Sequence, residues 1–270
     1  MPAVARLLQM PKVKKLIQLK KIMIMNNNDF NGGMQDFRSQ AAVFEDELTM
    51  RSYTSRIMRR VYVKMFLGLL VTALSALMLA SSEALFAAVF SSKVIFFGLI
   101  IAELAVVFVL SGAINRISAA TATILFYLYS VLNGVVLSSI FYNYSSDAVM
   151  LTFGITSAVF AAMSIFGFVT KQDLTKMGTF LFMALIGLIV ASIVNVFLGS
   201  SALDWGISLA GVAIFIGLTA WDTQKIKQWA MESDPSQVGK LATLGALSLY
   251  LDFINLFLYL LRIFGGSSRN

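Results

Sequence analysis

The sequence predicts an all-α integral membrane protein, a bundle of seven transmembrane helices. Of its 270 residues, 58% are hydrophobic and only 13% are charged, and the mean hydropathy is +0.81. A soluble protein of this size keeps a largely polar exterior, which this composition cannot supply. The apolar residues also gather into runs of about 20 residues, the helical length that crosses a hydrocarbon core of about 30 Å.

Short polar breaks separate the apolar runs. We place the seven spans at residues 65–80, 94–114, 119–142, 148–170, 177–198, 205–221 and 241–264. A further apolar stretch, 84–90, is too short to cross the membrane, so we expect an interfacial or re-entrant segment there.

Three parts are expected along the chain: a basic, flexible cytoplasmic tail at 1–54, the transmembrane domain at 55–265 and a short C-terminal tail at 266–270. Lysines and arginines alternate with Leu, Val and Ile in residues 6–22, a pattern that also suits an amphipathic helix on an anionic membrane surface. The three asparagines 26–28 and the pair Gly32-Gly33 predict a linker, and Met34 is an alternative start of translation.

Basic residues predict the orientation, because cytoplasmic segments are enriched in lysine and arginine. With the N-terminus inside, 18 of the 21 basic residues lie on the cytoplasmic side, and Lys93, Arg262 and Arg269 lie outside. An odd number of spans then leaves the C-terminus outside. The short loops suit a bacterial inner membrane. Membrane topology thus accounts for the net charge of +7, and we expect no nucleic-acid partner.

The chain contains neither cysteine nor histidine. Thiolate chemistry, histidine-based catalytic triads and the usual pH switch are therefore excluded. We expect no enzymatic activity and no resident cofactor. Proton chemistry is left to carboxylates, lysines and tyrosines, and the expected partners are the lipid bilayer, protons and a transported cation.

Ionisable residues inside the spans are the candidate functional residues, because burying a charge in lipid is costly. Asp252 lies twelve residues beyond Lys240, about 18 Å along a helix, and its short side chain cannot reach the interface. It must face the bundle interior, either as a functional group or as a neutral acid bonded between helices. Glu103 interrupts the second span, Asp222 lies at the cytoplasmic end of the sixth, and Arg116 follows the second span as an anchor or a functional cation.

Two segments carry a resemblance to a known family. Residues 246–257, ALSLYLDFINLF, followed by LLRIFG at 260–265, resemble the C-terminal signature of the Bax inhibitor family. The segment WDTQKI at 221–226 resembles a second signature, in which a tyrosine usually precedes the aspartate. The resemblance covers about residues 55–265.

The resemblance implies a seven-helix membrane protein that permits slow, pH-sensitive passage of calcium. It implies that Asp222 and Asp252 form a paired proton sensor, that Glu103 lies on the ion path and that Arg116 acts as a latch on Asp222. Physical chemistry supports such a pair, since two carboxylates sharing one site cannot both ionise cheaply and titrate as a unit. Calcium prefers oxygen ligands, which these three carboxylates supply. Alternatives are a non-conducting modulator of proteases or of stress- and death-related partners, and a proton-coupled exchanger.

Overall fold

The computed structural model describes Gln18 and residues 30–265. The chain divides into two compact units, Met1–Ser55 and Arg56–Asn270, and the bundle described below is the second unit. The described elements are all helical: α3 (Phe30–Ala80), α4 (Glu83–Phe90), α5 (Lys93–Gly112), α6 (Ala119–Leu137), α7 (Ile140–Asn143), α8 (Ser146–Val169), α9 (Thr175–Leu198), α10 (Ser201–Glu232), the short 3₁₀ helix η1 (Pro235–Gln237) and α11 (Val238–Phe264).

Seven segments of the described chain are long and apolar enough to cross a membrane, which confirms the predicted fold class. Both ends of the spans predicted at 94–114, 119–142, 148–170 and 177–198 lie within two residues of the observed segments, whereas the first, sixth and seventh segments begin earlier than predicted. The segment 84–90 forms the eight-residue helix α4, too short to span, as expected. Whether α4 lies at the membrane interface stays a prediction.

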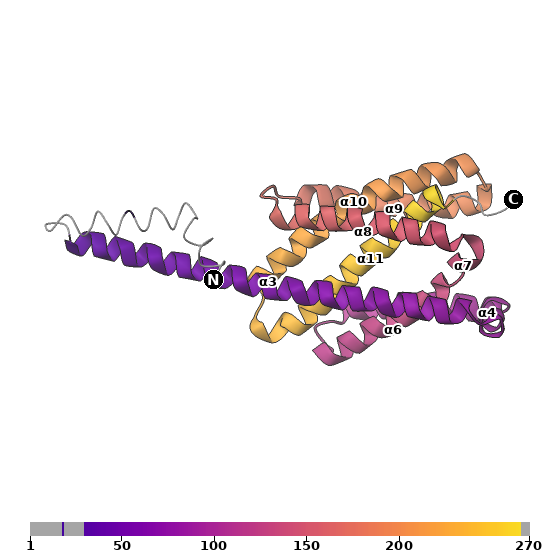
Figure 1. The fold of residues 1–270 in the computed structure, drawn as a ribbon, viewed down its shortest axis with the longest axis horizontal. Coiled ribbons are helices and arrows are strands. Elements are labelled where there is room, and N and C mark those ends of the chain that lie inside the picture. Colours follow the sequence, from indigo (N-terminus) through magenta and orange to yellow (C-terminus); the bar gives the residue numbers. More distant parts are fainter. Residues whose placement is uncertain (1–17, 19–29, 266–270) are drawn as a thin grey trace. The chain divides into compact units, whose positions relative to one another are not determined.

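Helix α11 is the centre of the bundle. It packs against α10, α8 and α6, and in Figure 1 it runs between α6 and the group formed by α8, α9 and α10. In the most apolar stretch of α11, 67% of the residues are buried, whereas the corresponding stretches of α5 and α9 are each only 6% buried. A side chain on α11 therefore faces protein almost wherever it points, and α5 and α9 turn most of their surface outward.

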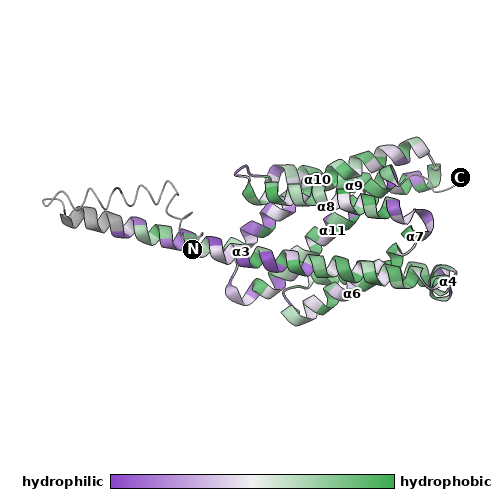
Figure 2. Cartoon of the chain, viewed as in Figure 1, coloured by the Kyte–Doolittle hydropathy of each residue, from purple (hydrophilic) through white to green (hydrophobic). Residues whose placement is uncertain are grey.

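The outward surface is apolar. Large hydrophobic side chains such as Phe97 and Phe108 on α5 and Phe197 on α9 are exposed, and Figure 2 shows hydrophobic residues along the helices of the bundle. In water such a surface would be strongly unfavourable, whereas lipid solvates it at no cost. The surface thus fits a bilayer.

Serine side chains set where many of the helices begin. Ser92, Ser118, Ser145 and Ser200 each precede a helix and accept a hydrogen bond from a backbone N–H in its first turn. These bonds satisfy donors that have no partner within the helix. Helix α9 ends at Gly199, whose φ of 62° is a left-handed conformation that glycine adopts without steric cost.

Two expectations about helix ends were wrong. Gly32-Gly33 is not a linker, because both residues lie within α3; the cost of about 1 kcal/mol per glycine is outweighed by the continuous helix that follows. The sixth span does not end at residue 221, since α10 continues to Glu232. The charged residues in the last turns of α10 indicate that the helix leaves the apolar part of the membrane there, but they remain helical. The basic residues of the expected amphipathic segment 6–22, the asparagines 26–28 and the expected C-terminal tail 266–270 lie outside the described residues.

Candidate functional site

The structure brings Asp222 and Asp252 together. Asp222 lies on α10, ten residues before its end, and Asp252 lies near the middle of α11. These two helices form an extensive contact, and Asp222 is the charged group that acts most strongly on Asp252, followed by Lys225. The Ser248 hydroxyl, one turn before Asp252, also faces Asp222.

Both carboxyl groups are removed from solvent, and each has one oxygen atom without a hydrogen-bond partner. Asp222 is 8% exposed and Asp252 is 5% exposed. Buried oxygen atoms of each, Oδ1 of Asp222 and Oδ2 of Asp252, have no hydrogen-bond partner. Two adjacent ionised carboxylates are strongly unfavourable in such a place, so the site needs a proton, a cation or both.

Lys225 provides a cation beside the pair. Its Nζ atom lies 3.6 Å from Oδ1 of Asp222, and it also lies 4.5 Å from the ring centre of Trp221 and 4.7 Å from that of Trp229. Residues 221, 225 and 229 are four apart, which places them on one face of α10. An ammonium group over an aromatic face is attracted by the ring quadrupole.

The end of α10 that carries this cluster is held by contacts with α9 and with the connection between α8 and α9. The Gln224 side chain accepts a hydrogen bond from the backbone N–H of Leu174 at 2.8 Å and donates one to the carbonyl of Gln172 at 2.7 Å. Trp221 lies against α9 at Gly178, where a β-carbon would collide with the indole ring. The position of Trp221 therefore depends on a glycine in the neighbouring helix.

Glu103 belongs to a different polar network. It lies on α5, where it interacts with the Asn133 side chain and with Tyr129 and Tyr250. Tyr250 donates a hydrogen bond of 3.1 Å to Asn133, and its hydroxyl lies 2.6 Å from that of Thr72 on α3. Residues 250 and 252 point to different sides of α11, so the structure does not bring Glu103 to the aspartate pair.

Arg116 lies in the connection between α5 and α6 and is exposed. Within the described part of the chain, no ion pair joins it to Asp222, whose ion pair is with Lys225. The role of Arg116 as a latch stays a prediction about another state of the protein.

No group of three or more Asp or Glu side chains in the described residues is arranged to hold a metal ion. The aspartate pair thus offers two carboxylates, and Glu103 is not a third. A cavity of about 540 Å³ opens where α10 gives way to α11; Ile114, Trp229, Asp234 and Lys240 are among the residues that line it. Trp229 therefore contributes both to this cavity and to the surroundings of Lys225.

Sequence reasoning missed Lys225, Trp229 and Tyr250 as parts of the two polar networks. In the sequence Lys225 is one of the basic residues of the cytoplasmic side and part of the segment 221–226. The spacing of four between Trp221, Lys225 and Trp229 was the available signal, since it predicts a shared helix face once the helix is known to continue. The pairing of Tyr250 with Asn133 had no local signal, because the two residues lie on different helices.

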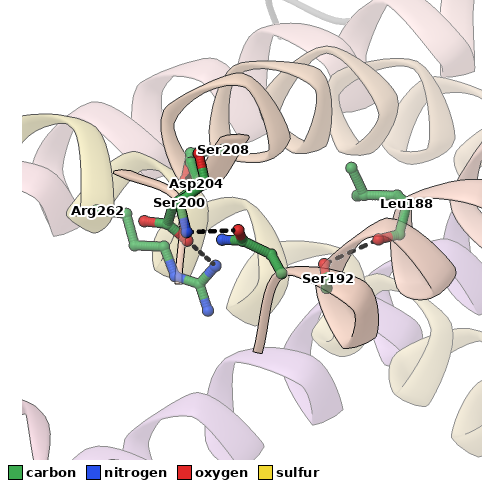
Figure 3. A network of polar contacts seen from close by, with 7 residues as sticks. Leu188, Ser192, Ser200, Asp204, Ser208 and Arg262 are labelled. Atoms are coloured by element: carbon green, nitrogen blue, oxygen red, sulfur yellow. Dashed lines mark hydrogen bonds and ion pairs between the residues drawn. The ribbon is translucent and has the colours of Figure 1, made fainter. Parts of the chain in front are cut away.

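A separate polar contact joins α10 and α11 at their other ends. Arg262 on α11 forms an ion pair of 3.7 Å with Asp204 on α10, and Ser200 donates a backbone hydrogen bond to the Asn195 side chain at the end of α9. Figure 3 shows both contacts. The side chains of the ion pair are about half exposed, so this pair is not part of the buried site.

Seven apolar helices, the central one of which carries a buried carboxyl group, define this chain as an integral, multi-pass membrane protein. Residues 54–270 match the family described as "Inhibitor of apoptosis-promoting Bax1". The chain is 47% identical over 236 residues to the inner membrane protein YbhL of Escherichia coli, an alignment that covers 86% of this chain and 99% of that protein. An uncharacterized protein of Rickettsia prowazekii is 42% identical over the same shares of the two chains. The chain belongs to the Bax inhibitor family.

Proposed function

We propose that this protein is a pH-sensitive calcium leak pathway in a bacterial inner membrane, gated by the paired aspartates Asp222 and Asp252. The N-terminus lies in the cytoplasm and the C-terminus outside, as the distribution of lysine and arginine favours. The single observation that carries the proposal is the pair itself, two buried carboxyl groups on adjacent helices with unsatisfied oxygen atoms.

The pair suits a proton-controlled gate. At high pH its negative charge attracts cations, Lys225 within the bundle and Arg116 from the neighbouring connection, and the helix ends are held closed. Acidification adds a proton to the pair and weakens that attraction. A path then opens past Asp252, and a calcium ion that follows it passes Glu103, in its separate network, further along. The flux of calcium therefore rises as the pH falls.

Other aspartates near the membrane ends do not suit this role. Hydrogen bonds from Thr175 hold the pKa of the Asp173 carboxyl below its usual value, and a backbone hydrogen bond from Ser236 does the same for Asp234. A carboxyl group with a lowered pKa stays ionised from about pH 6 to 8 and gives no response there.

Calcium flux into dye-loaded liposomes containing the purified protein tests the proposal. The wild type is expected to pass calcium faster as the pH falls from about 8 to 6, and Asp252→Asn is expected to flatten that dependence because the pair can no longer share a proton. Asp147→Asn, at an exposed position at the start of α8, is the matched control and should behave as wild type.

Three results would contradict the proposal. If Asp252→Asn keeps the wild-type pH dependence, the aspartates are not the sensor. If the wild type passes no calcium, a non-conducting modulator of proteases or stress-related partners is the better interpretation. If calcium moves only when an imposed pH gradient drives protons in the opposite direction, the protein is an exchanger that uses the same carboxylates.

A further inference from the structure

The geometry points to Lys225 as a tethered competitor of the transported cation, with an ammonium group that occupies the place beside Asp222 which an entering divalent ion would take. This inference rests on the proposed function, because it concerns the same aspartate pair. It assigns to Lys225 the control of how tightly that pair binds calcium.

Lys225 reaches the site from α10 itself. Its Nζ atom lies 3.6 Å from Asp222 and, after Asp222, is the strongest charge acting on Asp252. Asp222, Lys225 and the hydroxyl of Ser248 are the polar groups that act on the pair from α10 and α11. With two carboxylates and one ammonium group, the site keeps an excess of negative charge whenever both acids are ionised.

A calcium ion and the ammonium group cannot both occupy this site. Calcium binds carboxylate oxygen atoms at about 2.3–2.6 Å, which would bring it within a few ångström of Nζ. Two cations at such a distance repel each other strongly beside buried carboxyl groups. Calcium binding therefore requires Lys225 to move away from Asp222.

The contacts of Lys225 allow that movement. A distance of 3.6 Å is longer than the 2.7–2.9 Å of a strong charge-assisted hydrogen bond. Much of the attachment of Lys225 comes from the indole rings of Trp221 and Trp229, which attract an ammonium group without directed bonds. Its side chain is 30% exposed and thus has a way out of the site. Trp229 also lines the neighbouring cavity, where the displaced ammonium group would meet water.

Lys227 offers a matched control on the same helix. Its Nζ atom donates a hydrogen bond of 2.7 Å to the carbonyl of Phe168 on α8 and lies 5.0 Å from the ring centre of Phe168. It is not among the groups that act on either aspartate. Loss of its charge changes the net charge of the protein as much as loss of Lys225 does, but leaves the site intact.

The test is a calorimetric titration of the full-length protein in detergent with calcium chloride at about pH 8. Lys225→Gln is expected to lower the dissociation constant for calcium about tenfold, because the competing cation is gone. Lys225→Arg, which keeps the charge, and Lys227→Gln should stay within about twofold of wild type. The indole fluorescence of the wild type should change as calcium binds, since Lys225 leaves its two tryptophans, and this change should vanish in Lys225→Gln.

Equal affinity in Lys225→Gln and Lys227→Gln, weaker binding in Lys225→Gln, or no calcium binding in any variant would overturn the inference. Circular dichroism shows whether each variant folds, and Lys225→Met serves as a second neutral variant with the same expected gain. Failure of the proposed function is a separate result, seen as absent or pH-independent flux in liposomes, because the titration measures binding without conduction.

Discussion

Tyr250 on α11 donates a hydrogen bond of 3.1 Å to Asn133 on α6, while Asp252, two residues further on, faces Asp222 on α10. The central helix thus places a polar side chain into each of two separate networks on different sides. One network contains Glu103 and is built mainly of neutral donors and acceptors. The other contains the aspartate pair and Lys225. This separation allows the two networks to be tested independently.

Tyr250→Phe should lower the stability of the bundle by about 1–3 kcal/mol, because it leaves the buried side chain of Asn133 without its donor and removes the contact with the Thr72 hydroxyl. Thermal unfolding in detergent measures the effect. Tyr259→Phe is the control on the same helix, since the Tyr259 ring stacks on Phe215 and no hydrogen bond of its hydroxyl is found in the described part of the chain. Equal effects of the two substitutions would contradict the network around Tyr250.

Gly178→Ala should destabilise the protein by about 1–3 kcal/mol, because the new methyl group collides with the Trp221 indole and one of the two helices must shift. Gly187→Ala, also on α9, meets no atom within 4 Å and should cost nothing or stabilise the helix. Unfolding midpoints compare the two variants. A neutral Gly178→Ala would show that α9 and α10 are not packed as closely as described.

Gln224→Ala should loosen the connection between α8 and α9, since the amide group of Gln224 satisfies the N–H of Leu174 and the carbonyl of Gln172. Each lost bond leaves a backbone group unpaired at a cost of about 1–3 kcal/mol if water cannot reach it. We expect faster amide hydrogen exchange at residues 170–175, whereas the exposed Gln228→Ala leaves exchange there unchanged. Unchanged exchange in both variants would contradict this role of Gln224.

Arg262→Gln should change stability by no more than about 1 kcal/mol, because both partners of the ion pair with Asp204 are about half exposed. Thermal unfolding at low and at high salt is the measurement, and only a small difference between the two conditions is expected. A large, salt-dependent loss would mean that this end of the bundle is more enclosed than its exposure indicates.

Much of the fold followed from the sequence because lipid imposes a simple rule. Every backbone group in a bilayer must be bonded internally, so an apolar run of sufficient length becomes a helix. Spans such as 177–198 could be placed this way to within two residues of the observed Thr175–Leu198. Helix ends among charged residues could not be placed this way. Helix α10 runs eleven residues past 221, because hydropathy indicates where a chain leaves the lipid and not where a helix ends.

The sequence by itself determined that this is a bundle of seven membrane helices and that Asp252, too short to reach the interface, faces the interior. Hydropathy and the cost of burying a charge are sufficient for both conclusions. Only the tertiary structure decided which buried groups meet: it places Lys225 beside Asp222, and Glu103 with Asn133 and Tyr250. Which residues of different helices meet is fixed by the crossing angles and rotations of the helices. These depend on packing contacts such as that of Trp221 on Gly178, which the local sequence does not predict.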